Sequence, residues 1–279
     1  MKEITITIFL LLSVFSYSQN TDYNDSGSNK GKVFFYWGWN RGHFSQSDIT
    51  FKGDNYDFTL TRVKAGDKPK PFGIYYFKLD EITIPQTNFR LGYFFKENYT
   101  LSIGVDHMKY VMSNDQTVII NGNIQTGSEF DGAYNNNEII LTEDFLLFEH
   151  TDGLNYVNVE LSRFDNLDNW LKFKIKNIDI NLTEGIGAGM LYPKTNTTLL
   201  GKERYDEFHI SGYGFSAHAG LNITFFKHFF IQSNIKGGYI NMQEIRTTAS
   251  KTDVATQHFT FFENMYVFGA RFNLTKNKK

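Results

Sequence analysis

The chain of 279 residues contains no cysteine and only 4 prolines, and its charges nearly balance at a net −2. Without cysteine it forms no disulfide and has no thiol chemistry. A net charge so close to zero gives no overall field that attracts nucleic acid, so we expect no nucleic-acid partner. After the N-terminal segment, no apolar run approaches the roughly 18 residues of a membrane-spanning helix, which excludes a helical membrane protein.

The N-terminus predicts a signal peptide over residues 1–18. Lys2 precedes an almost unbroken apolar run from Ile4 to Phe15, and Ser16 and Ser18 place small residues before a cleavage site. The alternative, an N-terminal membrane anchor, needs a longer run. We therefore expect an exported chain with a single domain over residues 19–279.

Aromatic residues are abundant: the chain has 28 Phe and 16 Tyr beside 23 Gly, yet its mean hydropathy is only −0.37. A membrane β-barrel explains this mixture, because it alternates lipid-facing apolar residues with polar lumen residues and collects aromatics at both interfaces. Period-2 alternation predicts eight strands. They span about residues 32–43, 87–95, 99–112, 154–164, 178–192, 209–225, 229–242 and 258–274.

The connections between these strands alternate in length. Lys96–Asn98 and Phe226–His228 are tight turns and residues 165–177 form a moderate one, whereas the other four connections are longer. With a periplasmic N-terminus all long connections lie outside, as in bacterial outer-membrane barrels. The two longest loops, 44–86 and 113–153, contain strand-like pieces and aromatic residues that we expect at loop tips. These aromatics are Tyr75, Tyr76, Phe77, Phe145 and Phe148.

The eight alternating segments, with Phe272 and Leu274 in the last of them, resemble the eight-stranded outer-membrane barrels of the OmpA and OmpX type at the level of pattern. The resemblance implies an all-β, transmembrane, antiparallel up-and-down barrel in the outer membrane of a Gram-negative bacterium. The signal peptide, with Ser18-Gln19-Asn20 across its predicted cleavage site, is similar to those of Bacteroidota exported proteins. A soluble β-sandwich or lipocalin-like barrel is the rival, but it would place aromatics inside and charges outside.

On the predicted strands, the alternate residues that face the lumen include charged ones. An eight-stranded barrel has only enough interior for side chains, and charges taken out of water must pair. We therefore predict a salt-bridge network that fills the lumen; a gated proton or ion path is the alternative. The predicted lumen residues are Arg90, Asp106, Glu160, His218, Lys236, Glu263 and Arg271.

His209 and Ser211 form an H-x-S step that parity assigns to the lipid face, and hairpin pairing places Asn241 opposite Tyr213. This layout resembles outer-membrane lipid hydrolases, the phospholipase and the lipid A deacylase. The resemblance implies Ser211 as nucleophile, His209 as general base and Asn241 as the orienting group, with Ca²⁺ as an additional cofactor in the phospholipase type. The residue after Ser211 is Gly212, where both families have Asn, so a polar interface girdle is the alternative.

Asp106, His107 and Lys109 face Glu149–Asp152 at the outer ends of neighbouring predicted strands. This cluster would suit a divalent metal, or a lipopolysaccharide phosphate held by Lys109 and Arg41. The spacing matches no zinc motif, so we assign no metal site, and solvated rim charges are the alternative.

The sequence contains no Walker A, dinucleotide-binding, H-E-x-x-H or nucleophile-elbow motif. It therefore favours a non-enzymatic outer-membrane barrel without a cofactor, acting as a structural, binding or assembly component. We expect outer-membrane lipid and lipopolysaccharide around it, and an extracellular or membrane protein partner at loops 44–86 and 113–153. A lipid hydrolase and a narrow ion channel are the alternatives.

Overall fold

The computed structural model describes residues 28–71, 73, 76, 85–168, 172 and 175–273. The predicted signal peptide, Tyr75, Phe77 and Leu274 lie outside the described residues. No helix within these ranges is long enough and apolar enough to span a membrane.

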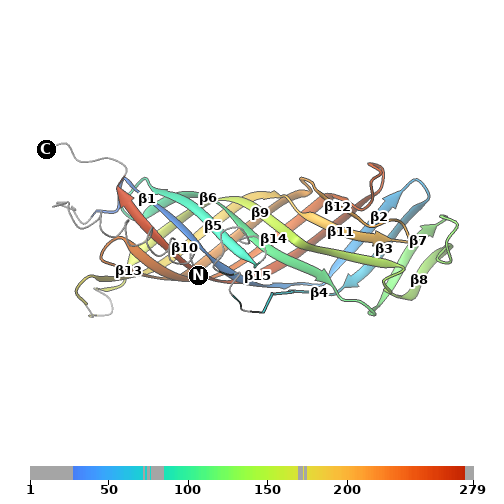
Figure 1. Cartoon of the computed structure of the whole chain (residues 1–279), viewed down its shortest axis with the longest axis horizontal. Helices are drawn as coiled ribbons and strands as arrows, with labels where there is room; N and C mark the ends of the chain where they lie inside the picture. The colour runs from blue at the N-terminus through green and yellow to red at the C-terminus, as the bar shows by residue number, and fades with distance from the viewer. Residues whose placement is uncertain are drawn as a thin grey trace, which may run out of the picture.

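Eight antiparallel strands close into a ring, and the last strand is hydrogen-bonded back to the first, as the alternation predicts (Figure 1). The strands of the ring, in spatial order, are β1 (Lys32–Phe44), β5 (Thr87–Phe94), β6 (Tyr99–Met112), β9 (Leu146–Asn166), β10 (Ile178–Leu191), β13 (Gly212–Phe225), β14 (Phe229–Arg246) and β15 (Val254–Asn273). The short connections and both ends of the described chain lie at one end of the ring, the turn end. The long connections lie at the other, the loop end.

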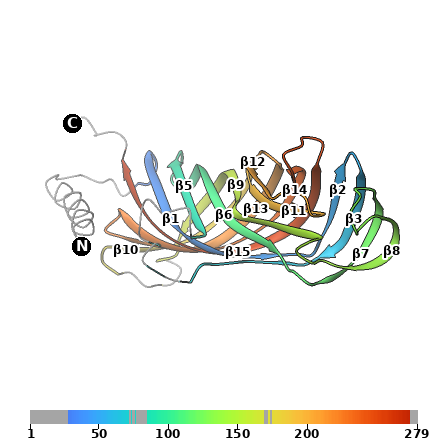
Figure 2. The ribbon, with the colours of Figure 1, turned by 45° about the vertical axis from the view of Figure 1, so that its right-hand side comes forward.

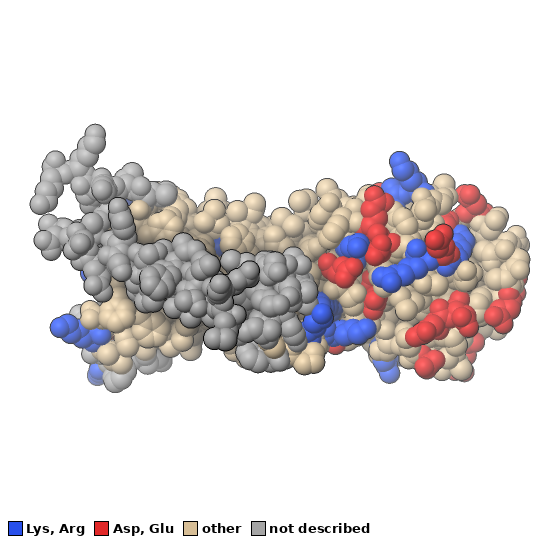
Figure 3. All heavy atoms as spheres, in the orientation of Figure 1, with Lys and Arg blue, Asp and Glu red and all other residues tan. Residues whose placement is uncertain are grey.

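An apolar belt surrounds the ring. Successive outward side chains are large, apolar and strongly exposed, for example Leu101 and Ile103 on β6, Ile186 on β10 and Phe215 on β13. In Figure 3 the Lys, Arg, Asp and Glu atoms gather over the loop end, and the visible part of the ring shows few of them. Aromatic side chains mark both margins of the belt: Tyr93, Phe95, Tyr99, Phe226 and Phe272 at the turn end, and Tyr192, Phe208, Tyr213, Tyr239 and Phe262 at the loop end.

Beyond the loop end the sheet continues as an extension (Figure 2). Strands β2 (Ser47–Gly53), β3 (Tyr56–Val63), β7 (Thr117–Ile124) and β8 (Gly132–Ile140) follow β15 in hydrogen-bonded order. On the other side, β11 (Lys194–Leu199) pairs with β9 and β12 (Tyr205–Phe208), and the short β4 (Ala65–Gly66) pairs with β6. Much of the two longest predicted loops is therefore regular sheet.

Several ring strands run further than the alternation predicts because they also build the extension. β9 begins at Leu146 instead of 154, and β14 ends at Arg246 instead of 242. In the extension these strands face an apolar core, so the polar parity that marks the lumen no longer applies. β13, in contrast, begins at Gly212 instead of 209, because residues 209–211 leave the regular strand.

The extension has its own core, which is continuous with the loop end of the lumen. Ile49, Phe51, Phe58, Leu60 and Ile120 are almost fully buried there. Each such side chain contributes about 1.5–3 kcal/mol on burial. Of the aromatics that we expected at loop tips, Phe145 and Phe148 belong to this core, and Tyr76 is buried with its ring beside Trp39 of β1, so that expectation is wrong for all three. Apolar side chains so far from the belt form a core that holds the long loops in a folded structure.

Candidate functional site

The middle of the lumen holds a charge cluster from four strands. Lys236 Nζ on β14 lies 2.5 Å from Asp106 Oδ2 on β6 and 2.7 Å from Glu160 Oε1 on β9. Arg90 on β5 approaches the same Glu160 oxygen at 3.0 Å and Asp106 at 3.7 Å. All four side chains are at most 3% exposed. Two cations therefore share two carboxylates in a site without bulk water, where electrostatic attraction is strong.

Neutral side chains complete this cluster. Asn158 Oδ1 accepts from Arg90 at 2.7 Å, and its amide donates to Asp106 at 2.9 Å. Asn88 donates to Asp106 Oδ1 at 2.7 Å and to Glu263 Oε1 at 3.0 Å. These hydrogen bonds add polar partners to charged groups that are buried away from water.

Six of the seven predicted lumen residues converge on this layer. His218 Nδ1 lies 3.6 Å from Glu160 Oε2, and Glu263 pairs in register with Lys236. Gly185 on β10 leaves room for the imidazole, because a Cβ there would lie 2.6 Å from His218 Cε1. Arg271 is the exception, since it lies in a different layer near the turn end.

The layer at the turn end is aromatic. Phe34, Phe94, Phe164 and Phe230 point inward and contact one another, with ring centroids 5.2–6.4 Å apart. The Arg271 guanidinium lies 5.6 Å from the Phe94 centroid and donates to Thr224 Oγ1 at 2.5 Å. This layer was not predicted from the sequence; its signal is one aromatic residue at an inward-facing position near the turn end of each of β1, β5, β9 and β14. Aromatic, charged and apolar layers thus follow one another along the interior.

The His–Ser pair does not form a nucleophile and base. Ser211 is 2% exposed and its hydroxyl donates to the His209 carbonyl oxygen at 3.4 Å, while His209 Nε2 lies 3.4 Å from Glu244 Oε1. The predicted lipid-facing position of Ser211 is wrong, because the chain leaves β13 here and Ile210 is exposed instead. Asn241 does lie opposite Tyr213, but its amide donates to the Tyr213 hydroxyl.

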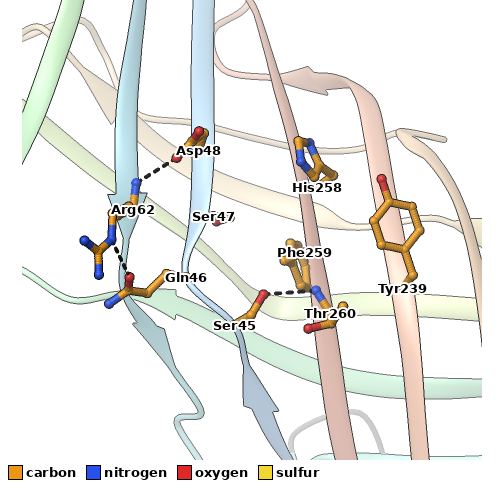
Figure 4. Close-up of a pocket in the computed structure, with 9 residues that line it drawn as sticks. All are labelled: Ser45, Gln46, Ser47, Asp48, Arg62, Tyr239, His258, Phe259 and Thr260. Carbon is orange, nitrogen blue, oxygen red and sulfur yellow. Dashed lines mark hydrogen bonds between the residues drawn. The ribbon is translucent and has the colours of Figure 1, made fainter.

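A second serine–histidine neighbourhood lies where β2 meets β15 (Figure 4). This pocket of about 240 Å³ is lined by Ser45, Ser47 and His258 among others. Ser45 Oγ accepts from the Thr260 amide at 3.1 Å, and Ser47 Oγ accepts from Gln257 at 2.8 Å. Within the described chain no hydrogen bond joins His258 to a serine hydroxyl of this pocket.

The predicted rim cluster separates into an inner and an outer part. His150 is buried in the extension, where Nδ1 lies 2.9 Å from Thr195 Oγ1, and burial lowers its pKa to about 3. His107 and Lys109 line a groove on the outer surface instead. Arg41 donates to the Asn40 carbonyl oxygen. Across the residues that the structure describes, no group of three or more His, Asp or Glu side chains is arranged to hold a metal ion.

Neither a protein-family model nor a curated protein sequence matches the chain. Solved structures that it resembles include AlkL in lipid bilayers (11% identity over 94% of this chain and 99% of AlkL, TM-score 0.42). Others are OprG of Pseudomonas aeruginosa (10%, 88% and 98%, 0.37) and Ail of Yersinia pestis (13%, 87% and 99%, 0.34). At these TM-scores the likeness supports no shared function or ligand. The hydrogen-bonded ring itself shows that the chain is an all-β protein with an eight-stranded antiparallel barrel.

Proposed function

We propose that the chain is an outer-membrane barrel that anchors a folded extracellular extension and binds a partner through it, without catalysis or transport. A closed ring leaves no unpaired edge in lipid, and aromatic margins suit the two interfaces of a bilayer. The belt therefore lies in the membrane, the turn end in the periplasm and the extension outside. An origin in the Bacteroidota stays a prediction from residues that the structure does not describe.

One observation carries the proposal: the ring strands β9, β14 and β15 continue without interruption into a sheet that has its own apolar core. A plain barrel needs no such core outside the membrane. Two-strand hairpins are marginal in water, whereas a packed multi-stranded sheet holds a fixed surface. A binding surface on a rigid scaffold loses little conformational entropy when it engages a partner.

The outermost strand, β8, offers accessible positions for such contact. Ala133 and Glu138 are exposed, and β8 ends the hydrogen-bonded order of the described sheet. A register irregularity in its pairing with β7 and a positive φ of 55° at Asn136 interrupt its regular edge. Such features protect an edge from indiscriminate strand pairing, which is consistent with selective binding.

Site-specific photo-crosslinking in cells of the native organism tests this proposal. A photoreactive residue at Ala133 or Glu138 is expected to give a discrete adduct with one outside partner, whereas one at Lys176 in the turn-end connection is not. Lack of any adduct at both β8 positions in correctly inserted protein would contradict a binding role for the extension.

A further inference from the structure

The pocket between the β2–β3 hairpin and strands β14 and β15 opens on the outer surface, just beyond the apolar belt (Figure 4). Tyr239 and Thr260 line it and are cross-strand neighbours in register. Tyr239 belongs to the aromatic margin at the loop end, and the next outward residue below Thr260 is the strongly exposed Phe262. The pocket therefore lies at the height of lipid headgroups, with lipid-facing side chains directly below it.

An arginine of this pocket is turned outward by its backbone. Leu60 on β3 faces the core, and strict alternation would place Arg62 on the same inner face. Arg62 is exposed instead, with a φ of 58°, which is strained for a residue that has a side chain. The pairing of β2 with β3 is irregular between Ser47 and Ile49, which marks a bulge. Bulges at barrel rims often re-aim a side chain, and this one brings Arg62 to the pocket.

Two residues of the bulge hold this arginine in place. Gln46 Oε1 accepts from Arg62 Nε at 3.1 Å, and Asp48 Oδ1 accepts from the backbone amide of Arg62 at 2.8 Å. Among the described residues, neither the Arg62 guanidinium nor the Asp48 carboxylate is part of an ion pair. The pocket therefore presents two opposite charges that do not neutralise each other. The terminal guanidinium nitrogens and Asp48 Oδ2 keep their hydrogen-bonding capacity for a ligand.

The remaining polar groups of the pocket favour a phosphate beside the arginine. Ser45 Oγ accepts from the backbone amide of Thr260 at 3.1 Å, so its own proton remains available to a ligand. Together with the planar guanidinium of Arg62, this donor suits the oxygens of a phosphate group. The Asp48 carboxylate only accepts hydrogen bonds, so it suits a protonated amine. The pocket thus matches a ligand that carries both groups.

Below the pocket the surface of the belt is shallow at Gly237. This glycine faces outward, because its register partners Ala217 and Phe262 are both exposed. A Cβ at Gly237 would have one neighbour within 4 Å, the Phe261 carbonyl oxygen at 3.8 Å, so packing among the described residues does not require glycine. Glycine inside a strand often marks a place where a ligand approaches the backbone closely. An acyl chain that lies over Gly237 and Ala217 reaches the pocket from below.

We propose that this pocket binds the headgroup of an outer-leaflet lipid that combines a phosphodiester with a primary amine, the phosphoethanolamine class. The phosphate oxygens accept from Arg62 and Ser45, and the ammonium group donates to Asp48 Oδ2. A headgroup with a phosphate alone leaves Asp48 without a partner, and a quaternary ammonium has no N–H to donate. This inference rests on the proposed orientation of the barrel, with the loop end outside the cell.

Native mass spectrometry of the delipidated protein in detergent tests the site. The probes are short-chain phosphatidylethanolamine, phosphatidylglycerol, phosphatidylcholine and free phosphoethanolamine. We expect phosphatidylethanolamine to bind about tenfold more tightly than the other two lipids, since one hydrogen bond between charged groups distinguishes them.

The two charged residues should affect binding in different ways. Asp48→Asn keeps an Oδ1 acceptor for the backbone amide of Arg62, so it should abolish the preference for phosphatidylethanolamine without weakening the binding of phosphatidylglycerol. Arg62→Gln should weaken the binding of all three lipids several-fold. The matched control is Lys52→Gln on the same hairpin, whose side chain pairs with Asp57 outside the pocket, and it should have no effect.

Three results would overturn the proposal: equal binding of phosphatidylethanolamine and phosphatidylglycerol, a preference that survives Asp48→Asn, or free phosphoethanolamine that binds as tightly as the lipid. The comparison among lipids on the native chain needs no variant, so it decides the question even if a variant misfolds. Insertion of the protein into phosphatidylcholine vesicles is scored separately. A protein that inserts but shows no lipid preference refutes the pocket and leaves the proposed membrane function intact.

Discussion

At the scale of single residues, the lumen cluster depends on charge balance among groups that are closed off from water. Lys236 contacts both Asp106 and Glu160, so its removal leaves Arg90 to pair with two buried carboxylates. Breaking a buried ion pair by deleting one partner is far more costly than replacing the whole pair. The cluster therefore joins β5, β6, β9 and β14 across the lumen.

We predict that Lys236→Ala lowers the free energy of unfolding by about 3–5 kcal/mol. The measurement is urea-induced unfolding of the barrel in liposomes, followed by the electrophoretic shift between folded and unfolded forms. Lys251→Ala, which removes an exposed lysine from the extension, is the matched control. An unchanged midpoint for Lys236→Ala would show that the cluster is hydrated and not a plug.

Ser211 provides a second prediction at this scale. Because its hydroxyl binds a backbone carbonyl and not the imidazole, Ser211→Ala is expected to leave the masses of phospholipids and lipid A in outer membranes unchanged. The lipid masses are compared by mass spectrometry among cells that contain the native protein, the Ser211→Ala variant or neither. Loss of an acyl chain only in cells with intact Ser211 would restore the hydrolase interpretation.

At the scale of elements, the extension is distinct from the barrel because its interior is apolar. His150 on β9 lies inside this core, with Phe148 and Tyr110 rings 5.1 and 5.5 Å away, and burial lowers its pKa to about 3. Since the unfolded segment has the ordinary value of about 6.5, it binds more protons than the folded one between these two values. The contribution of His150 is fully present above about pH 6.5 and declines as pH falls toward 3.

We therefore predict that acid loosens the extension before the barrel. Hydrogen exchange of β2, β3 and β7 should accelerate between pH 6.5 and 4 by up to about tenfold per pH unit, after correction for intrinsic rates. His150→Gln should flatten this dependence. Equal corrected amide protection of these strands at pH 6.5 and pH 4 in the native chain would contradict this prediction.

How far the sequence predicts these elements depends on whether their signal is local. Alternation of residues such as Tyr213, Phe215 and Ala217 against Gly214 and Ser216 locates ring strands, because one parity faces lipid along the whole strand. The extension is harder to predict from the sequence, since β2 pairs with β15, which lies about 200 residues away in the chain. The core of the extension also combines residues from every long connection. Ser211 was misplaced because parity assumes an unbroken strand, and pairing is lost at residues 209–211.

At the scale of the whole molecule, three interior layers follow one another: aromatic at the turn end, charged in the middle and apolar in the extension. Eight strands leave only enough interior for these side chains. This filled interior favours a membrane anchor over a channel. The sequence predicted the charged layer through parity, but the aromatic layer depends on the packing of four separate strands.

We predict that the purified protein gives no stable single-channel conductance in planar bilayers, because a water path would have to cross both the aromatic and the apolar layer. Phe34→Ala with Phe230→Ala, which opens the aromatic layer alone, should still not conduct. Discrete openings of the native chain that change on Lys236→Ala would instead support the ion-channel alternative.

The central claim is that the belt lies in the outer membrane and the extension outside the cell. Because the chain has no cysteine, single cysteines can report on each end without background. The decisive measurement is labelling of intact cells with a membrane-impermeant maleimide, using Ala133→Cys on β8 and Lys176→Cys in the turn-end connection. We predict immediate labelling at residue 133, and labelling at residue 176 only after the outer membrane is permeabilised. Equal labelling of both positions on intact cells, or the reverse pattern, would contradict the account.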